Sequence, residues 1–173
     1  MKISRYKWYP AHFSEANDIS NLLNLAYRGS ENWTEETMLL EGARASSSLI
    51  ECSMNESGTC FFVCRNETVL LACIRLTLVG NEAYIGSFAL LPKYQGKGIG
   101  THLLSEIEKM AMLEYGVTLF SLPVLTEQTV LKRFYEKCGY HKTGYSEPYP
   151  AHLNIGKPKR SDVMIDFYLK KAV

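Results

Sequence analysis

The sequence lacks both an excess of charge and a long apolar run. Its 173 residues carry 19 Lys and Arg against 18 Asp and Glu, a formal net charge of +1. Nucleic-acid-binding proteins usually carry a strongly basic stripe, so we expect no nucleic-acid partner. No apolar stretch approaches the ~20 residues of a membrane-spanning helix, so we expect no membrane partner. The N-terminal residues are charged without an apolar core behind them, which argues against a signal peptide and favours a cytoplasmic protein.

Cysteine and histidine are few and scattered. The five cysteines form no Cys-x-x-Cys pair, and the four histidines do not cluster. Zinc sites need ligands at short spacings, so we expect no metal. Cys60, Cys64 and Cys73 lie in apolar runs, where a free thiol behaves as a small hydrophobic group. We interpret these three as structural.

No feature divides the chain into parts. It has no internal repeat, low-complexity tract or block of like charge. A domain of this length buries about 70% of the surface that its unfolded chain exposes, enough to support its own core. We therefore expect one domain over residues 1–173.

The apolar pattern predicts alternating strands and helices. Period-2 and β-rich runs predict strands, and apolar residues at helical spacing predict helices. The expected strands are 6–9, 59–65, 68–79, 82–91, 117–124, 140–145 and 162–169. The expected helices are 14–28, 34–42, 99–114 and 126–138, with a short helix over 46–54 left open. This order indicates a mixed α/β (α+β) domain with antiparallel hairpins around one crossover helix.

A glycine-rich loop is the strongest functional signal. It joins the strand over 82–91 to the helix over 99–114. Its backbone N–H groups and the unpaired donors of the helix start together suit a phosphate. Glycines at 96, 98 and 100 have the wrong spacing for the dinucleotide motif. The Gly96-Lys97 pair lacks the following Ser or Thr of a nucleotide P-loop.

Gln95, Gly98 and Gly100 instead match the pattern Gln/Arg-x-x-Gly-x-Gly/Ala. The segment LLPKYQGKGIGTHLL thus resembles the pyrophosphate-binding motif of the GNAT N-acetyltransferases. The later run LKRFYEKCGY, residues 131–140, resembles the family's late helix. The two motifs stand in the family's order, and the resemblance covers residues 60–145. It implies the GNAT fold, a mostly antiparallel sheet of about six or seven strands flanked by helices.

The resemblance also implies acetyl-CoA as co-substrate. Backbone N–H groups from Gln95 to Thr101 would hold its pyrophosphate, and the end of strand 82–91 would pair with the pantetheine amides. Gln128 stands where many relatives have an Asn that contacts the pantetheine, and whether Gln makes this contact stays open. The implied cofactor-binding residues are Phe88, Ala89, Leu90, Gln95, Gly96, Lys97, Gly98, Ile99, Gly100, Thr101, Gln128 and Tyr135.

Acyl transfer to an amine needs a base for the ammonium and a proton donor for the leaving thiolate. Tyr135 matches the family tyrosine near the thioester sulfur and is the candidate acid; the alternative is a packed aromatic residue.

Relatives often place a carboxylate base on the strand before the glycine loop. Glu82 is the candidate there, with a solvated turn residue as the alternative. Ser87 lies nearer the expected centre but is a poor base, and backbone carbonyls with water are a further possibility.

Two other regions are candidates for the acceptor site. Residues 27–35 lie where the family places a specificity loop, and Arg28 and Trp33 would bind an acceptor there by pairing or stacking. Alternatively, Trp33 is a hydrophobic staple before a helix. The second region is the Pro-Tyr-Pro loop over 145–152, in which His152 is either a proton carrier or an incidental loop residue.

These observations predict an N-acetyltransferase that moves an acetyl group from acetyl-CoA directly to a primary amine of a small molecule. Two alternatives stay open. One is acetylation of a protein lysine or N-terminus, and the other is acyl-CoA binding without turnover. We expect a monomer or a homodimer.

Overall fold

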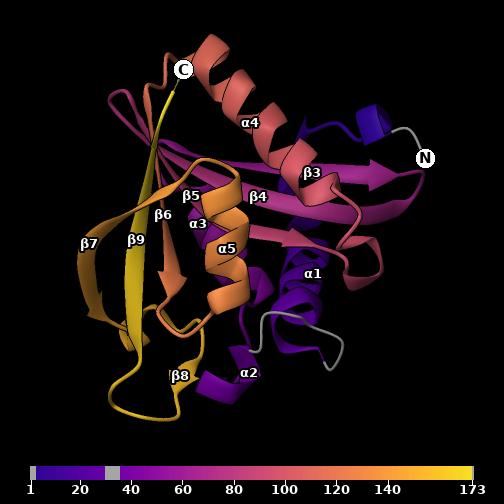
Figure 1. Ribbon diagram of the computed structural model, residues 1–173. Coiled ribbons are helices and arrows are strands. Elements are labelled where there is room, and N and C mark those ends of the chain that lie inside the picture. Colours follow the sequence, from indigo (N-terminus) through magenta and orange to yellow (C-terminus); the bar gives the residue numbers. More distant parts are fainter. Residues whose placement is uncertain (1–2, 30–35, 173) are drawn as a thin grey trace.

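The computed structural model describes residues 3–29 and 36–172. Its main sheet has seven strands in the order β1-β3-β4-β5-β6-β9-β7. Neighbouring strands are antiparallel except β5 and β6, which are parallel. The strands are β1 (Tyr9–Pro10), β3 (Thr59–Asn66), β4 (Val69–Val79), β5 (Glu82–Leu90), β6 (Leu119–Leu125), β7 (His141–Pro148) and β9 (Met164–Lys171). This confirms the expected mixed class with a mostly antiparallel sheet (Figure 1).

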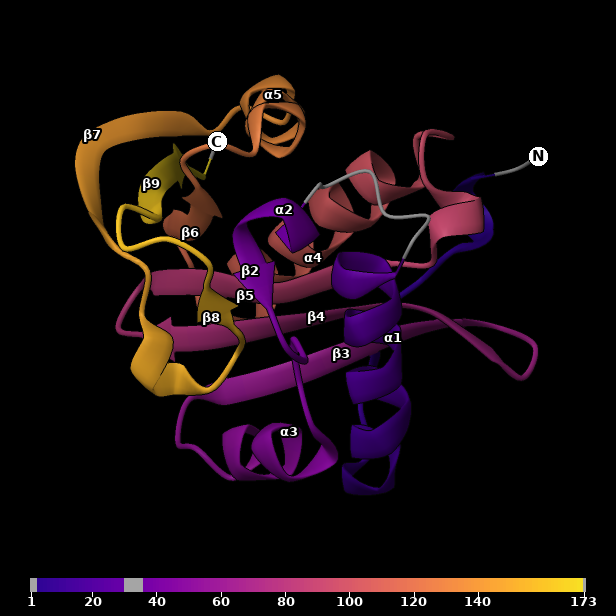
Figure 2. The ribbon, with the colours of Figure 1, turned by 90° about the horizontal axis from the view of Figure 1, so that it is seen from below.

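Helices cover both faces of the sheet. On one face lie α1 (Ala16–Arg28) and α3 (Ser47–Met54), and on the other α4 (Ile99–Tyr115) and α5 (Thr129–Lys137) (Figure 2). Because side chains alternate along a strand, Phe61 of β3 packs with the α1 face while its neighbour Phe62 packs with the α4 face.

The remaining elements are short. They are α2 (Glu36–Leu39), a two-stranded sheet of β2 (Leu40–Glu41) and β8 (Lys157–Pro158), and the 3-10 helices Ile3–Arg5, Phe13–Glu15, Pro92–Tyr94 and Ala151–Leu153. The pairing of β2 with β8 was not predicted. A helix was expected over 34–42. Within the described residues it ends at Leu39, because Leu40 and Glu41 pair with β8 as a strand.

Other boundaries also differ from the prediction. The first strand is Tyr9–Pro10 rather than 6–9, and a proline is tolerated there because β1 lies at the sheet edge. Helix α5 begins at Thr129, three residues after the expected start. The segment left open over 46–54 is a helix, capped by the Ser46 hydroxyl, which accepts a hydrogen bond from the backbone N–H of Leu49.

Strands β5 and β6 pair only at their starts. Their partners run from Glu82 opposite Leu119 to Tyr84 opposite Ser121. On its other side, β5 stays paired with β4 as far as Leu90. Within the described residues, the second half of β5 therefore has an open edge towards β6, which leaves backbone groups available for other partners.

A bulge in β5 lies at the start of this open edge. Between Gly86 and Ala89, β5 contains one more residue than the β4 segment opposite, and Ser87 has a φ angle of 50°. The extra residue reverses the alternation of side chains. Ile85 therefore packs with the α4 face, whereas Ala89 packs with the α1 face.

A buried carboxylate ties α5 to the far end of the sheet. Asp166 of β9 has an exposed fraction of 0% and lies 2.9 Å from Lys132 Nζ of α5 and 3.0 Å from Lys142 Nζ of β7. Burial alone would raise the pKa of Asp166, but hydrogen bonds from Ser146, Lys132 and Lys142 outweigh it and hold this pKa well below its usual range. This cluster positions α5, the helix that carries Tyr135, on the sheet.

We expect Asp166→Asn to reduce the free energy of unfolding at pH 7 by about 2–3 kcal/mol. This is less than the ~3–5 kcal/mol typical when one partner of a fully buried pair is removed, because Lys142 reaches solvent. Since the folded-state pKa of Asp166 is depressed, its contribution exists above the unfolded-state pKa of about 4 and is lost as the pH falls further. The difference between variant and wild type should therefore shrink in denaturant titrations below pH 4.

The matched control is Asp162→Asn, since the Asp162 side chain is 74% exposed and forms a surface ion pair with Arg160. It should leave stability unchanged. An Asp166→Asn variant as stable as wild type at pH 7 would show that the cluster does not hold α5.

Candidate active site

The glycine loop is shaped by left-handed backbone conformations. Gly96 and Gly98 have φ angles of 69° and 75°, and Gly98 is the N-cap residue of α4. Such angles strain any residue with a side chain but not glycine. The first N–H groups of α4, those of Ile99, Gly100 and Thr101, have no intrahelical acceptor. The loop therefore presents backbone donors at the positive end of a 17-residue helix.

A cleft of about 730 Å³ extends from this loop between β5 and α5. Most of the residues predicted to bind a cofactor line it. These are Phe88, Ala89, Leu90, Gln95, Gly96, Gly98, Gly100, Thr101 and Tyr135. The structure thus brings the two sequence motifs, 35 residues apart in the chain, to opposite walls of one cleft.

Three predicted cofactor residues do not line this cleft. The Ile99 side chain is fully buried in the core under α4, so only its backbone faces the loop. Lys97 is exposed, and its Nζ donates to the carbonyl of Lys93 at 2.6 Å. Gln128 is buried and lines a second, neighbouring cavity.

Side chains bind two carbonyls on the open edge of β5. Tyr27 Oη donates to the carbonyl of Phe88 at 2.6 Å, and Gln95 Nε2 donates to that of Leu90 at 2.8 Å. The first bond holds α1 against β5, and the second holds the glycine loop there. Gln95 therefore has a structural role in addition to the predicted one through its backbone.

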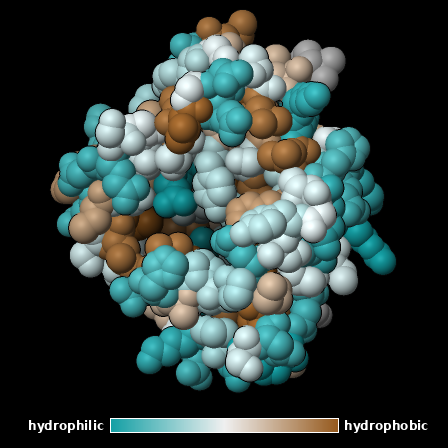
Figure 3. Space-filling view, turned by 90° about the vertical axis from the view of Figure 1, so that its left-hand side faces the viewer, coloured by the Kyte–Doolittle hydropathy of each residue, from teal (hydrophilic) through white to brown (hydrophobic). Residues whose placement is uncertain are grey.

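The second cavity, of about 150 Å³, meets the cleft. Four residues line both of them: Tyr27, Phe88, Leu131 and Tyr135. Beyond this junction the smaller cavity has a largely apolar lining, to which Glu36, Arg44, Arg75, Tyr84 and Tyr149 add polar groups. On the side of the molecule that carries β7 to β9, the surface is hollowed, with hydrophilic residues at the bottom of the hollow and hydrophobic residues beside it (Figure 3).

Tyr135 lies at the junction of the two cavities. Its side chain is 5% exposed, and its ring packs edge-on against Phe134 and Tyr140, with centroids 5.1 and 5.7 Å away. Burial raises the pKa of Tyr135 well above its usual value, so its hydroxyl is protonated at neutral pH. Tyr135 is thus a packed aromatic with a protonated hydroxyl, and it lines both cavities.

The structure places Glu82 far from this junction in the fold. Glu82 is exposed at the hairpin end of β5, where it pairs with Val79 and Leu119, and it lines neither cavity. It occupies the solvated turn position that was its alternative interpretation, and we no longer consider it a base. Among the described residues that line the two cavities, Glu36 is the one carboxylate.

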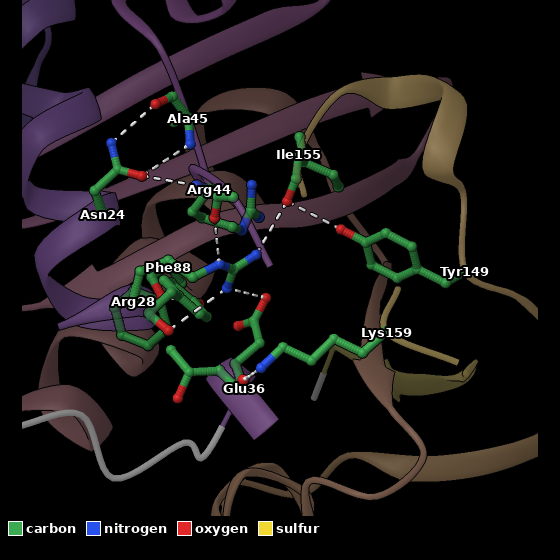
Figure 4. Close-up of polar contacts among 12 residues, drawn as sticks. Asn24, Arg28, Glu36, Arg44, Ala45, Phe88, Tyr149, Ile155 and Lys159 are labelled. Carbon is green, nitrogen blue, oxygen red and sulfur yellow. Dashed lines mark hydrogen bonds and ion pairs between the residues drawn. The ribbon is translucent and has the colours of Figure 1, made fainter. Parts of the chain in front are cut away.

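Arg28 holds the wall of the second cavity rather than lining it (Figure 4). Its guanidinium lies 2.7 Å from Glu36 Oε1 and donates to the carbonyls of Gly42 at 3.0 Å and Ile155 at 3.1 Å. The hydroxyl of Tyr149 donates to the same Ile155 carbonyl at 3.0 Å. Arg28 therefore makes contacts within the protein through its guanidinium, and its binding of an acceptor stays a prediction.

Of the two remaining candidate residues of the acceptor site, the structure describes His152 but not Trp33. Trp33 lies outside the described residues. His152 is exposed and lines neither cavity. Its loop nevertheless contributes Tyr149, Pro150 and Ile155 to the second cavity.

Residues 3–29 and 36–172 contain no group of three or more His, Cys, Asp or Glu side chains placed to hold a metal ion. In the same part of the chain, each helix is too short or too polar to cross a membrane.

Cys64 and Cys73 are fully buried, and Cys60 packs against the core, as expected for structural thiols.

Comparison with known proteins identifies the family. The sequence profile described as Acetyltransferase (GNAT) family matches residues 16–140. The chain belongs to the GNAT acetyltransferases. No relative was found among curated protein sequences.

Solved GNAT structures share the fold over nearly the whole chain. One is a spermidine N-acetyltransferase from Vibrio cholerae in complex with CoA and spermine. It has a TM-score of 0.72 and 16% identity, with 97% of this chain and 96% of that chain covered. Another is a GNAT acetyltransferase from Elizabethkingia anophelis with acetyl-CoA bound. It has a TM-score of 0.71 and 16% identity, with 96% of this chain and 98% of that chain covered. At such identities the likeness shows the fold alone.

The bulge at Ser87 shapes the junction and can be tested by substitution. A left-handed backbone costs a non-glycine residue about 1–2 kcal/mol, while glycine loses roughly 0.5–1 kcal/mol of backbone entropy on folding. We therefore expect Ser87→Gly to lie within about 1 kcal/mol of wild type. Ser87→Val should lose about 2 kcal/mol or more, because a β-branched side chain is poorly tolerated at positive φ.

Denaturant titration measures both variants, and Ser121→Val is the control because Ser121 lies in the regular part of β6. Valine suits a regular strand, so this control should be as stable as wild type. If Ser87→Val proved equally stable, the left-handed bulge would not be a constraint on the sequence.

Proposed function

We propose that this chain transfers the acetyl group of acetyl-CoA directly to a primary amine of a small molecule. The observation that carries the proposal is the meeting of two cavities at Tyr135. Direct transfer requires both reactants to meet at one point, and the cleft and the small cavity offer each reactant its own approach. The 150 Å³ size of the second cavity favours a small acceptor over an extended peptide. The shared fold with an enzyme crystallised with CoA and spermine supports the same class.

The cleft fits CoA in shape and chemistry. Its volume of about 730 Å³ lies in the usual range for small-molecule sites. Backbone donors of the glycine loop and the start of α4 suit the pyrophosphate, and Arg133 and Lys137 add positive charge to the lining. The open edge at Phe88 to Leu90 suits the pantetheine amides, which would pair with it as an added strand. When bound, acetyl-CoA supplies the acetyl group as a reactive thioester.

The reaction forms a C–N bond and breaks a C–S bond, while the amine loses one proton and the thiolate gains one. Tyr135 Oη is the proposed proton donor to the thiolate, because it is protonated and lies at the junction. With Glu82 outside both cavities, Glu36 is the proposed acceptor of the ammonium proton, directly or through water. The salt bridge from Arg28 keeps the Glu36 carboxylate in place in the cavity wall.

Thermal unfolding with acetyl-CoA, CoA, NAD and ATP in parallel tests the choice of co-substrate. A ligand at 100 times its Kd stabilises the folded state by about 2.7 kcal/mol, which corresponds to a shift in Tm of roughly 5–10 °C for a chain of this size. We expect this shift with acetyl-CoA and CoA but not with NAD or ATP. Release of free CoA thiol with a panel of primary amines then tests transfer.

No shift with either CoA compound, or a larger one with NAD or ATP, would contradict the assignment of the glycine loop. A shift without thiol release from any amine would instead favour acyl-CoA binding without turnover.

Tyr135→Phe tests the proton donor. The substitution removes one hydroxyl and keeps the packed ring, so the Tm shift with acetyl-CoA should persist. Loss of general acid catalysis typically costs about 100-fold or more in rate, and we expect kcat to fall by about that factor. Tyr9→Phe, on an exposed side chain outside both cavities, is the control. Turnover as fast as that of the control would remove Tyr135 from the mechanism.

A further inference from the structure

One arginine lies flat on the strand that forms the floor of the second cavity. Arg75 of β4 is the register partner of Gly86 of β5, and both residues line the cavity. A Cβ atom on Gly86 would lie 2.7 Å from Arg75 Nη2 and 3.1 Å from Nε. Only the absence of a side chain at Gly86 allows the guanidinium to lie there. This placement brings a cation to within two residues of the junction at Phe88.

The guanidinium of Arg75 is incompletely satisfied by the protein. Its Nη1 donates to Ser53 Oγ at 3.3 Å. Its Nε is buried and has no hydrogen-bond partner among the described residues. A buried donor without a partner is unfavourable, so the protein alone does not fully satisfy this cavity-lining guanidinium.

A second arginine lines the same cavity. The guanidinium carbon of Arg44 lies 5.3 Å from the centroid of the Tyr27 ring, a cation–π distance. The backbone of its loop is fixed, because the N–H groups of Arg44 and Ala45 donate to Asn24 Oδ1 at 2.7 and 3.2 Å (Figure 4). In the described part of the chain, no ion pair neutralises Arg44 or Arg75.

The charges of this cavity do not balance. Glu36, the one carboxylate among the described lining residues, is already paired with Arg28 at 2.7 Å, so neither of the two other arginines forms an ion pair with it. Burial lowers the pKa of Arg75, and the like charge of Arg44 lowers it as well, whereas Tyr84 and the carboxylate of Glu56, which lies outside the cavity lining, act in the opposite direction. A positively charged, partly dehydrated cavity repels a second ammonium group and attracts an anion.

We propose that the acceptor amine also carries a carboxylate, which Arg44 and Arg75 bind. Guanidinium groups bind carboxylates through parallel N–H donors, and both arginines line the cavity without an ion pair among the described residues. The inference rests on the proposed function, since it assumes that the amine reacts at the junction. Gly86, where Arg75 lies, and Phe88, at the junction, are two positions apart on β5, with the bulge residue Ser87 between them. The amine and the carboxylate of the acceptor are therefore separated by several bonds.

Three five-carbon amines of equal length test the acceptor class. δ-Aminovalerate ends in a carboxylate, pentylamine in a methyl group and cadaverine in a second ammonium. Charge-assisted hydrogen bonds each contribute about 1.5–3 kcal/mol, equivalent to roughly 10- to 150-fold in affinity. We expect kcat/KM for δ-aminovalerate to exceed that for the other two by at least about 10-fold. A preference for cadaverine, or equal use of all three, would overturn the inference and leave acetyl transfer intact.

Variants identify the binding groups. Arg75→Met and Arg44→Met should each lower kcat/KM for δ-aminovalerate by about 10-fold or more and leave that for pentylamine nearly unchanged. The matched control is Arg160→Gln, whose guanidinium pairs with Asp162 and Glu127 on the surface, outside both cavities. If Arg75→Met fails to fold, Arg44→Met carries the same test. Equal losses for δ-aminovalerate and pentylamine would indicate a structural role only and would overturn the inference.

A binding measurement separates this inference from the proposed function. Valerate has the carboxylate but no amine, so it cannot be acetylated. With CoA bound, valerate should raise the Tm of the wild type, compared with chloride at equal ionic strength, and should not raise that of Arg44→Met or Arg75→Met. This result would support the anion site even if no amine were acetylated. No stabilisation of the wild type by valerate would overturn the anion site even if acetylation occurred.

Discussion

The structure depends above all on the separation of β5 from β6 after three paired positions. A strand edge inside a protein leaves backbone groups that must find partners, and here the partners come from elsewhere. Tyr27 and Gln95 bind two of the carbonyls, and a ligand that pairs like a strand suits the remaining groups. The glycine loop, the bulge at Ser87 and the position of α5 are all arranged around this one unpaired edge.

The two cavities differ in the kind of recognition that they offer. The larger cleft presents mainly backbone donors and apolar side chains, which suits a ligand shared by a whole family. The smaller one adds charged and polar side chains, among them Glu36, Arg44, Arg75 and Tyr149, to a largely apolar lining. Side chains change more easily in evolution than a strand–loop–helix geometry does. The co-substrate is therefore fixed by the fold, whereas the acceptor depends on individual residues.

The co-substrate side of the site could be predicted because its signals are local. Left-handed glycines, a helix start and a tyrosine on the next helix all lie within short segments with characteristic residue spacing. The acceptor side depends on pairings between distant segments. The bulge at Ser87 exists only relative to β4, and although Gly86 in the segment Ile-Gly-Ser-Phe hints at an irregular strand, it does not show where the register shifts. Arg75 lies in an apolar run, and its importance emerges only through its register with Gly86. Glu82 was expected near the chemistry from its strand alone, but its position along that strand places it at the wrong end.

The contact between Arg28 and the Ile155 carbonyl joins residues 127 positions apart in the chain. Closing a loop of that length costs more conformational entropy than forming the local hairpins of β3, β4 and β5. Contacts between distant residues generally slow folding, so we expect the sheet and the glycine loop to form before the contact between Arg28 and Ile155. The molecule would then acquire its cleft first and complete the wall of the second cavity last. The second cavity is accordingly the part of the site that local sequence determines least.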